Sequence, residues 1–176
     1  PDPWTSSDAA IGWQNFGGLT VFVAWGLWIA RGHLKDVFRK AFRGDEAVDD
    51  SQELLPYRTA VFALIFSLIY TSLFLHQAGM DILPVLAFGG ALWVTYLGLA
   101  RIMVESGLVF MRGPITPQAF VWHVFGVIGL GPASASILGL TFSFHCDTKT
   151  LAMTPLAHIP RLGASMNLQS RRRLVS

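Results

Sequence analysis

Four long stretches of the chain carry no formally charged side chain, and they constrain its fold more than any other feature. They cover residues 9–30, 59–80, 82–100 and 115–144. A helix needs about 20 predominantly apolar residues to cross the hydrocarbon core of a bilayer. The sequence therefore predicts an all-α protein, a polytopic transmembrane helical bundle.

The composition fits a chain whose solvent is largely lipid. Of the 176 residues, 52% are hydrophobic and 14% are charged, whereas soluble domains carry about 25% charged residues. The basic residues lie in short clusters between the apolar runs, so we expect no nucleic-acid surface. The single cysteine, Cys146, excludes an intrachain disulfide.

We expect one membrane domain over residues 1–176. Its predicted elements are spans at about 11–30, 59–78 and 82–100, an interfacial helix at 31–43, a broken helical segment at 115–146 and a polar basic tail at 147–176. The chain begins without methionine and without a basic stretch before its first apolar run. This start predicts a processed chain or a portion of a longer one.

The segment at 31–43 has the pattern of an amphipathic helix. Its apolar residues recur at i, i+3, i+4, i+7 and i+8, and Lys and Arg side chains occupy most of the remaining positions. Because this segment directly follows the first predicted span, we expect it to lie in the headgroup region of the membrane. The alternative is a solvated helix packed on a neighbouring domain.

The basic residues also predict an orientation. Residues 31–58 contain six Lys and Arg, whereas residues 1–10 and 78–84 contain none. Short cytoplasmic loops are rich in Lys and Arg, so loop 31–58 should be cytoplasmic and the N-terminus extracytoplasmic. The expected location is a bacterial inner membrane, either cytoplasmic or intracytoplasmic.

Residues 115–144 are too long for one straight span. Thr116-Pro117 is a typical helix start, and the run Gly129–Pro132 should end that helix and begin another. At 1.5 Å per residue, residues 117–128 form about 18 Å of helix, which is shorter than the hydrocarbon core. We predict two half-helices that form a re-entrant helical hairpin or a broken membrane helix.

The second half-helix carries small residues at intervals of four: Gly131, Ala135, Gly139 and Ser143. Such a face allows two membrane helices to approach closely. We therefore expect helix packing along it, within this chain or with a partner. Leu138 should lie on another face, where truncation has a milder effect.

No catalytic signature is present. The chain lacks a Walker A motif, HExxH, GxSxG and an EF-hand loop, so we expect neither a catalytic residue nor an enzymatic activity. Arg101 and Glu105 are four residues apart. They predict either an ion pair at a helix end or part of a polar pathway, because charges beside a membrane core tend to be functional.

Four of the five histidines are considered as possible ligands: His76, His123, His145 and His158. No pair has the spacing to share a metal ion, and His123 is the best single candidate for a cofactor ligand; the alternative is a hydrogen-bonded packing role. In His145-Cys146-Asp147, consecutive side chains diverge on a helix, so we expect no metal site. No cofactor motif is recognisable, and the identity of any cofactor stays unknown.

Three segments carry a resemblance to known proteins. RGHLKDVFRKAFRG at 31–44, ARIMVESGLVFM at 100–111 and MTPLAHIPRLGASMN at 153–167 resemble uncharacterised bacterial membrane proteins that look like distant relatives of the oligopeptide transporter family. The resemblance covers about residues 13–166. It implies a portion of a permease that moves a small solute or peptide. Members of that group are several times longer and have more spans.

Two functions follow as expectations. In the first, the chain is a non-catalytic accessory subunit that packs against other integral membrane subunits, for example in a photosynthetic or respiratory complex, or against its own copies. In the second, it contributes to an oligopeptide-transporter-like permease, because the family resemblance implies one. The bilayer is a partner in both.

Overall fold

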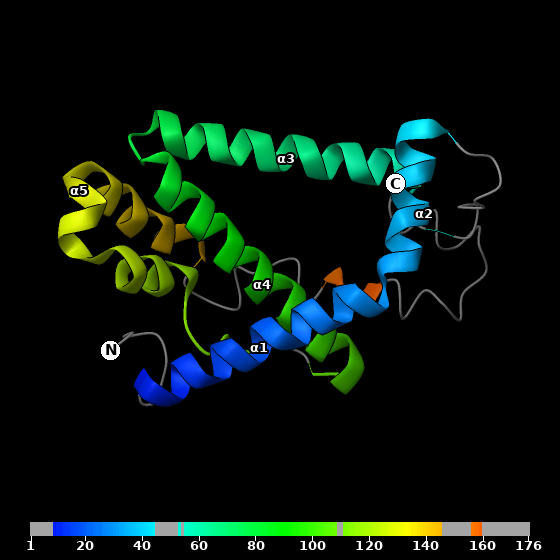
Figure 1. The fold of residues 1–176 in the computed structure, drawn as a ribbon, viewed down its shortest axis with the longest axis horizontal. Coiled ribbons are helices and arrows are strands. Elements are labelled where there is room, and N and C mark those ends of the chain that lie inside the picture. Colours follow the sequence, from blue (N-terminus) through cyan, green and yellow to red (C-terminus); the bar gives the residue numbers. More distant parts are fainter. Residues whose placement is uncertain (1–8, 45–52, 54, 109–110, 146–155, 160–176) are drawn as a thin grey trace. The chain divides into compact units, whose positions relative to one another are not determined.

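Every described element of the chain is helical, which confirms the all-α prediction (Figure 1). The computed structural model describes residues 9–44, 53, 55–108, 111–145 and 156–159. Its main helices are α1 (Ala9–Ile29), α2 (Arg31–Arg43), α3 (Tyr57–Gln77), α4 (Ile82–Ser106) and α5 (Pro117–His145). Two of them, α3 and α4, are long and apolar enough to cross a membrane, each with a mean hydropathy of 1.8.

Helix α1 forms where the first span is predicted, but it is not among the helices apolar enough to count as a candidate span. The amides of Gln14 and Asn15 interrupt its apolar stretch, and its glycines lower the mean hydropathy of the remaining residues. A crossing by α1 therefore stays a prediction.

The chain divides into two compact units. The first comprises Pro1–Val23 and Ser72–His158, and the second comprises Ala24–Thr71 and Ile159–Ser176. Helices α1 and α3 each contribute residues to both units.

In the second unit, α2 has the bounds predicted for the amphipathic helix. Its backbone nearly continues α1, because the Leu34 amide donates to the Ala30 carbonyl at 2.9 Å. Gly44 ends the helix with φ of 66°, and its amide donates to the Lys40 carbonyl. Glycine adopts this left-handed conformation without the steric cost that other residues incur.

In the first unit, the core forms where the turn after α3, helix α4 and helix α5 meet. Its fully buried members include Met80, Val121, Leu130 and Leu138. The turn is held by the His76 ring, whose Nδ1 donates to the Met80 carbonyl at 2.9 Å. Apolar burial of this kind contributes about 25 cal/mol per Å².

Helix α5 is broken, as predicted, but the break begins earlier than Gly129–Pro132. The two non-helical residues are Gly126, with φ of 68°, and Gly131, with φ of 66°. The predicted start is confirmed, because the Thr116 hydroxyl accepts a hydrogen bond from the Ala119 amide at 3.2 Å. Proline at 132 follows the second glycine and begins the next helical stretch.

The two halves of α5 lie side by side, and the start of the first contacts the end of the second (Figure 1). Gln118 donates from Nε2 to the Thr141 hydroxyl at 3.1 Å, and Thr141 in turn donates to the Leu138 carbonyl at 2.6 Å. The segment therefore turns back on itself. That this turn is re-entrant in a membrane stays a prediction.

Helix α4 passes its predicted end at residue 100 and continues to Ser106. Gly107 ends it with φ of 72°, and its amide donates to the Met103 carbonyl. Near the middle of α4, a Cβ added at Gly98 would lie 2.5 Å from Leu19 Cδ1 and 3.2 Å from Val23 Cγ2. Gly98 is therefore the point at which α1 packs closely against α4.

Candidate functional site

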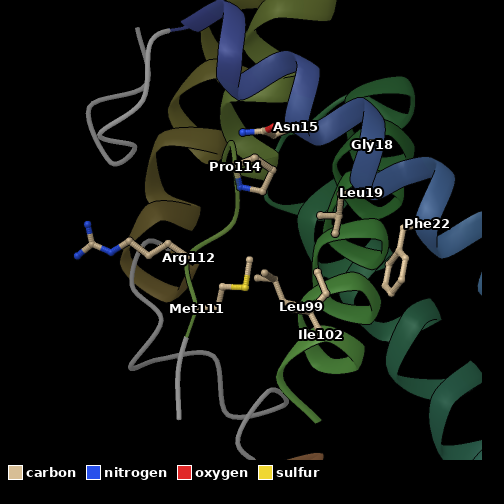
Figure 2. A pocket seen from close by; sticks show the side chains of 9 residues that line it. All are labelled: Asn15, Gly18, Leu19, Phe22, Leu99, Ile102, Met111, Arg112 and Pro114. Carbon is tan, nitrogen blue, oxygen red and sulfur yellow. The ribbon is translucent and has the colours of Figure 1, made fainter. Parts of the chain in front are cut away.

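A pocket of about 340 Å³ lies beside this contact between α1 and α4 (Figure 2). Helix α1 contributes Gly18 and Phe22, helix α4 contributes Leu99 and Ile102, and the segment before α5 closes one side. The complete lining is Asn15, Gly18, Leu19, Phe22, Leu99, Ile102, Met111, Arg112 and Pro114.

The chemistry of this pocket is mainly apolar. Asn15 lies at one end beside Pro114, whereas the Arg112 side chain extends away from the cavity in Figure 2. None of the lining residues is a carboxylic acid, a histidine or a cysteine, so they hold no general acid–base pair. The pocket suits an apolar group with one amide available for a hydrogen bond.

Sequence reasoning missed this pocket, although Asn15 gave a signal. An amide inside an otherwise apolar stretch is costly in lipid unless it faces protein or a cavity. That argument needs only the sequence, and it singles out Asn15. The contribution of Met111 and Pro114 depends on how the segment before α5 folds, and no local pattern predicts it.

Arg101 and Glu105 form the predicted ion pair. Arg101 Nε lies 2.9 Å from Glu105 Oε1, and both side chains are exposed. The Arg101 guanidinium also lies over the Phe22 ring, 4.9 Å from its centroid. Neither Arg101 nor Glu105 lines the pocket, so the geometry agrees with the helix-end interpretation, and the polar pathway stays a prediction.

A second polar contact joins residues far apart in the sequence. The Asp81 amide donates to Ser134 Oγ at 3.0 Å, and that hydroxyl donates to Asp81 Oδ2 at 3.1 Å. Ser134 is buried, and both of its hydrogen bonds are used to fix α5 against the turn before α4. Because the Ser134 hydroxyl donates its proton to Asp81, it does not donate that proton to a histidine, as an activated serine nucleophile would.

His123 has a fixed tautomer. Its Nδ1 lies 2.7 Å from the Ala119 carbonyl, and because a carbonyl can only accept, Nδ1 carries the proton. The ring also meets Trp13 edge-on, with centroids 5.3 Å apart. These contacts match the packing alternative, while the ligand role stays a prediction. Among the described residues, no cluster of three His, Cys, Asp or Glu could hold a metal ion.

His158 contacts the end of α4. His158 donates from Nε2 to the Leu108 carbonyl at 3.0 Å, which ties the short helical turn at 156–159 to the end of α4. The run His145-Cys146-Asp147 lies outside the residues whose side chains the structure describes.

The small-residue stripe is open within the described chain. A Cβ added at Gly139 would meet nothing within 4 Å, and Ser143 is exposed. The buried face of this half-helix is instead Leu130, Ser134, Leu138 and Thr141. Leu138 does lie on another face than the stripe, but it is fully buried, and the effect of its truncation on assembly stays a prediction. Packing of the stripe against a partner stays a prediction.

A family described as a family of unknown function, DUF6785, matches residues 3–176. The chain belongs to the DUF6785 family. No curated protein and no solved structure matches it significantly.

Membership in DUF6785 assigns no activity to the pocket, to the Arg101–Glu105 pair or to His123. The family description also names no transporter, so the resemblance to the oligopeptide transporter family stays a prediction for this DUF6785 chain. Its function has to be argued from the exposed surfaces of its helices.

Proposed function

We propose that this DUF6785 chain is a non-catalytic integral membrane subunit that packs in the bilayer against other membrane proteins or its own copies. The observation that carries the proposal is the exposed surface of α3. Only 11% of its most apolar 18-residue stretch is buried. Large apolar side chains are exposed along it, including Phe62, Leu64, Phe66, Ile69, Leu73 and Phe74.

An apolar surface of this extent needs a cover. Soluble monomers rarely expose contiguous apolar patches of more than a few hundred Å², and α3 has exposed apolar side chains on several sides. Helices that are hydrophobic all round belong to a membrane or to the interior of a larger protein. Lipid and neighbouring membrane helices together provide such a cover.

The open stripe on α5 supports the same proposal. Gly139 and Ser143 are exposed and Gly131 and Ala135 partly so, and membrane helices associate through small residues that bring backbones close. We place the chain in a bacterial inner membrane with loop 31–58 on the cytoplasmic side, on the strength of its Lys and Arg distribution.

The second candidate function is that of a portion of an oligopeptide-transporter-like permease. The non-helical glycines at 126 and 131 favour it, because transporters often build their sites from discontinuous helices. Arg101 and Glu105 would then lie near the substrate path.

Membrane extraction and co-purification test the proposal. The chain should stay in membranes during an alkaline carbonate wash, and membrane subunits should co-purify with it stoichiometrically in mild detergent. Gly139→Leu should reduce this association and leave thermal stability unchanged, whereas Leu140→Ala, at an exposed neighbouring position, should retain it. Release by carbonate would reject the membrane location, and substrate uptake by vesicles containing the chain would favour the permease.

A further inference from the structure

Helix α2, in the second unit, carries a groove of about 450 Å³ along one side. Its lining is Lys35, Phe38, Arg39, Phe42 and Arg43. Residues three and four positions apart lie on the same side of a helix. The groove therefore combines an aromatic floor with a basic rim on a single helical element.

The aromatic floor is exposed and ordered by its neighbours. Phe38 and Phe42 stack with their ring centroids 6.3 Å apart, and they are 45% and 60% exposed. Phe42 also meets the edge of Phe62 in α3, with centroids 5.7 Å apart. Aromatic rings held in this way present apolar area at a fixed position.

Three basic side chains line the groove: Lys35, Arg39 and Arg43. Arg39 is already engaged, because its Nη1 lies 3.9 Å from Asp36 Oδ1 and it makes a further interaction. Lys35 and Arg43 are therefore the side chains that favour an anionic occupant, and Arg in particular suits the oxygens of a phosphate.

The surroundings of α2 suggest where this occupant comes from. Phe62 lies near the start of α3, a candidate span, so its contact with Phe42 would bring α2 to the end of a membrane-crossing helix. At the other end, Arg31 donates to the Trp28 carbonyl at 3.0 Å and lies 4.7 Å from the centroid of its ring. Trp and Arg are typical of the membrane–water interface.

We propose that this groove binds the phosphate of an anionic phospholipid headgroup, with the start of the acyl chains on Phe38 and Phe42. The inference rests on the proposed membrane location and adds a specific lipid site to it. An acidic protein segment would satisfy the charges, but it would not explain an exposed aromatic floor beside a candidate span.

Lipid selectivity in reconstituted vesicles tests the site. The whole chain is placed in phosphatidylcholine vesicles with and without phosphatidylglycerol, and spin-labelled forms of both lipids report how strongly each is restricted by the protein. The test variant is Lys35→Gln with Arg43→Gln. The matched control is Arg31→Gln with Lys40→Gln, which removes two charges of the same sign from α2 outside the groove lining.

The unmodified chain should prefer phosphatidylglycerol. Any basic residue near an anionic membrane surface contributes up to about fivefold, so both double variants should lose some of the preference, and the groove variant should lose clearly more than the control. The charge-conserving Lys35→Arg, Arg43→Lys variant should keep most of it. Excess inorganic phosphate should not displace the lipid, because it lacks acyl chains to contact the phenylalanines.

Three results would overturn the site. An unmodified chain without preference, equal losses in the groove and control variants, or displacement by inorganic phosphate would each exclude a specific lipid groove. Loss of a co-purifying acidic protein from the groove variant alone would reassign the surface to protein docking. A chain that restricts neither lipid and is released by carbonate would instead reject the proposed membrane location.

Discussion

Gly98 occupies a position where α1 leaves no room for a side chain on α4. The nearest atoms to an added Cβ are Leu19 Cδ1 at 2.5 Å and Leu19 Cγ at 2.8 Å. The Leu19 side chain would have to move even for alanine. A larger residue would push the two helices apart.

Gly98→Leu should therefore lower stability, by about 1–3 kcal/mol from overpacking. Gly90→Leu is the control on the same helix, because an added Cβ there meets nothing within 4 Å and leucine has the better helix propensity. Thermal unfolding in detergent should show a lower midpoint for the first variant only. Equal midpoints would mean that the contact contributes little.

Loss of the Gln118–Thr141 hydrogen bond should destabilise the protein more when only Thr141 is replaced than when both residues are replaced. Gln118 is fully buried, and its Oε1 accepts no hydrogen bond from the described residues. Thr141→Val should cost about 1–3 kcal/mol, because it leaves the Gln118 amide without its acceptor. The double variant Gln118→Leu, Thr141→Val should recover much of that loss, since both polar groups are then gone. Denaturant unfolding of the single and double variants measures the difference, and an additive loss would contradict it.

Local contacts could be predicted from the sequence, and distant ones could not. The Arg101–Glu105 pair and the Thr116 cap follow from spacings within one helical turn. The Asp81–Ser134 bond joins residues 53 positions apart, and its formation depends on how α5 packs. Gly98 likewise resembles any other glycine until α1 is placed against it.

At the scale of elements, the charged and apolar pattern predicted the extent of the helices well. Helix α2 begins and ends at the predicted residues, since its basic and apolar positions repeat with helical period. Helix α4 continues to Ser106, because Arg101 is compatible with a helix and the helix ends only at Gly107. The buried face of α5 was not predicted, because it depends on how the two halves of the helix pack, and the small-residue stripe lies outside it.

Helix α2 provides the element-scale prediction. Replacing Phe38 and Phe42 with serine should loosen the helix and raise amide hydrogen exchange over 31–43, because full burial of each aromatic side chain is worth about 1.5–3 kcal/mol. Vesicles containing the chain are the required setting. Gly32→Ser, at an exposed position with open space around its Cα, is the control. Unchanged protection in the phenylalanine variant would show that other contacts hold the helix.

For the whole molecule, the decisive property is which side of the membrane each segment faces. On a Cys146→Ser background, single cysteines at Ser51 and Ser170 can be labelled with a membrane-impermeant maleimide. A re-entrant α5 requires both positions to label from the cytoplasmic side, because its two ends then lie on one face of the membrane. Labelling from opposite sides would instead indicate that α5 crosses.

The amides of α1 have a consequence for biosynthesis. Gln14 and Asn15 lower the tendency of this helix to partition from the insertion machinery into lipid on its own. Helix α4 is long and apolar enough to cross a membrane, and Leu19 of α1 contacts it at Gly98. In the proposed membrane setting, we therefore expect α1 to insert into the bilayer only together with α4. A chain truncated before α4 should leave α1 accessible from water, where a cysteine at Thr20 would react.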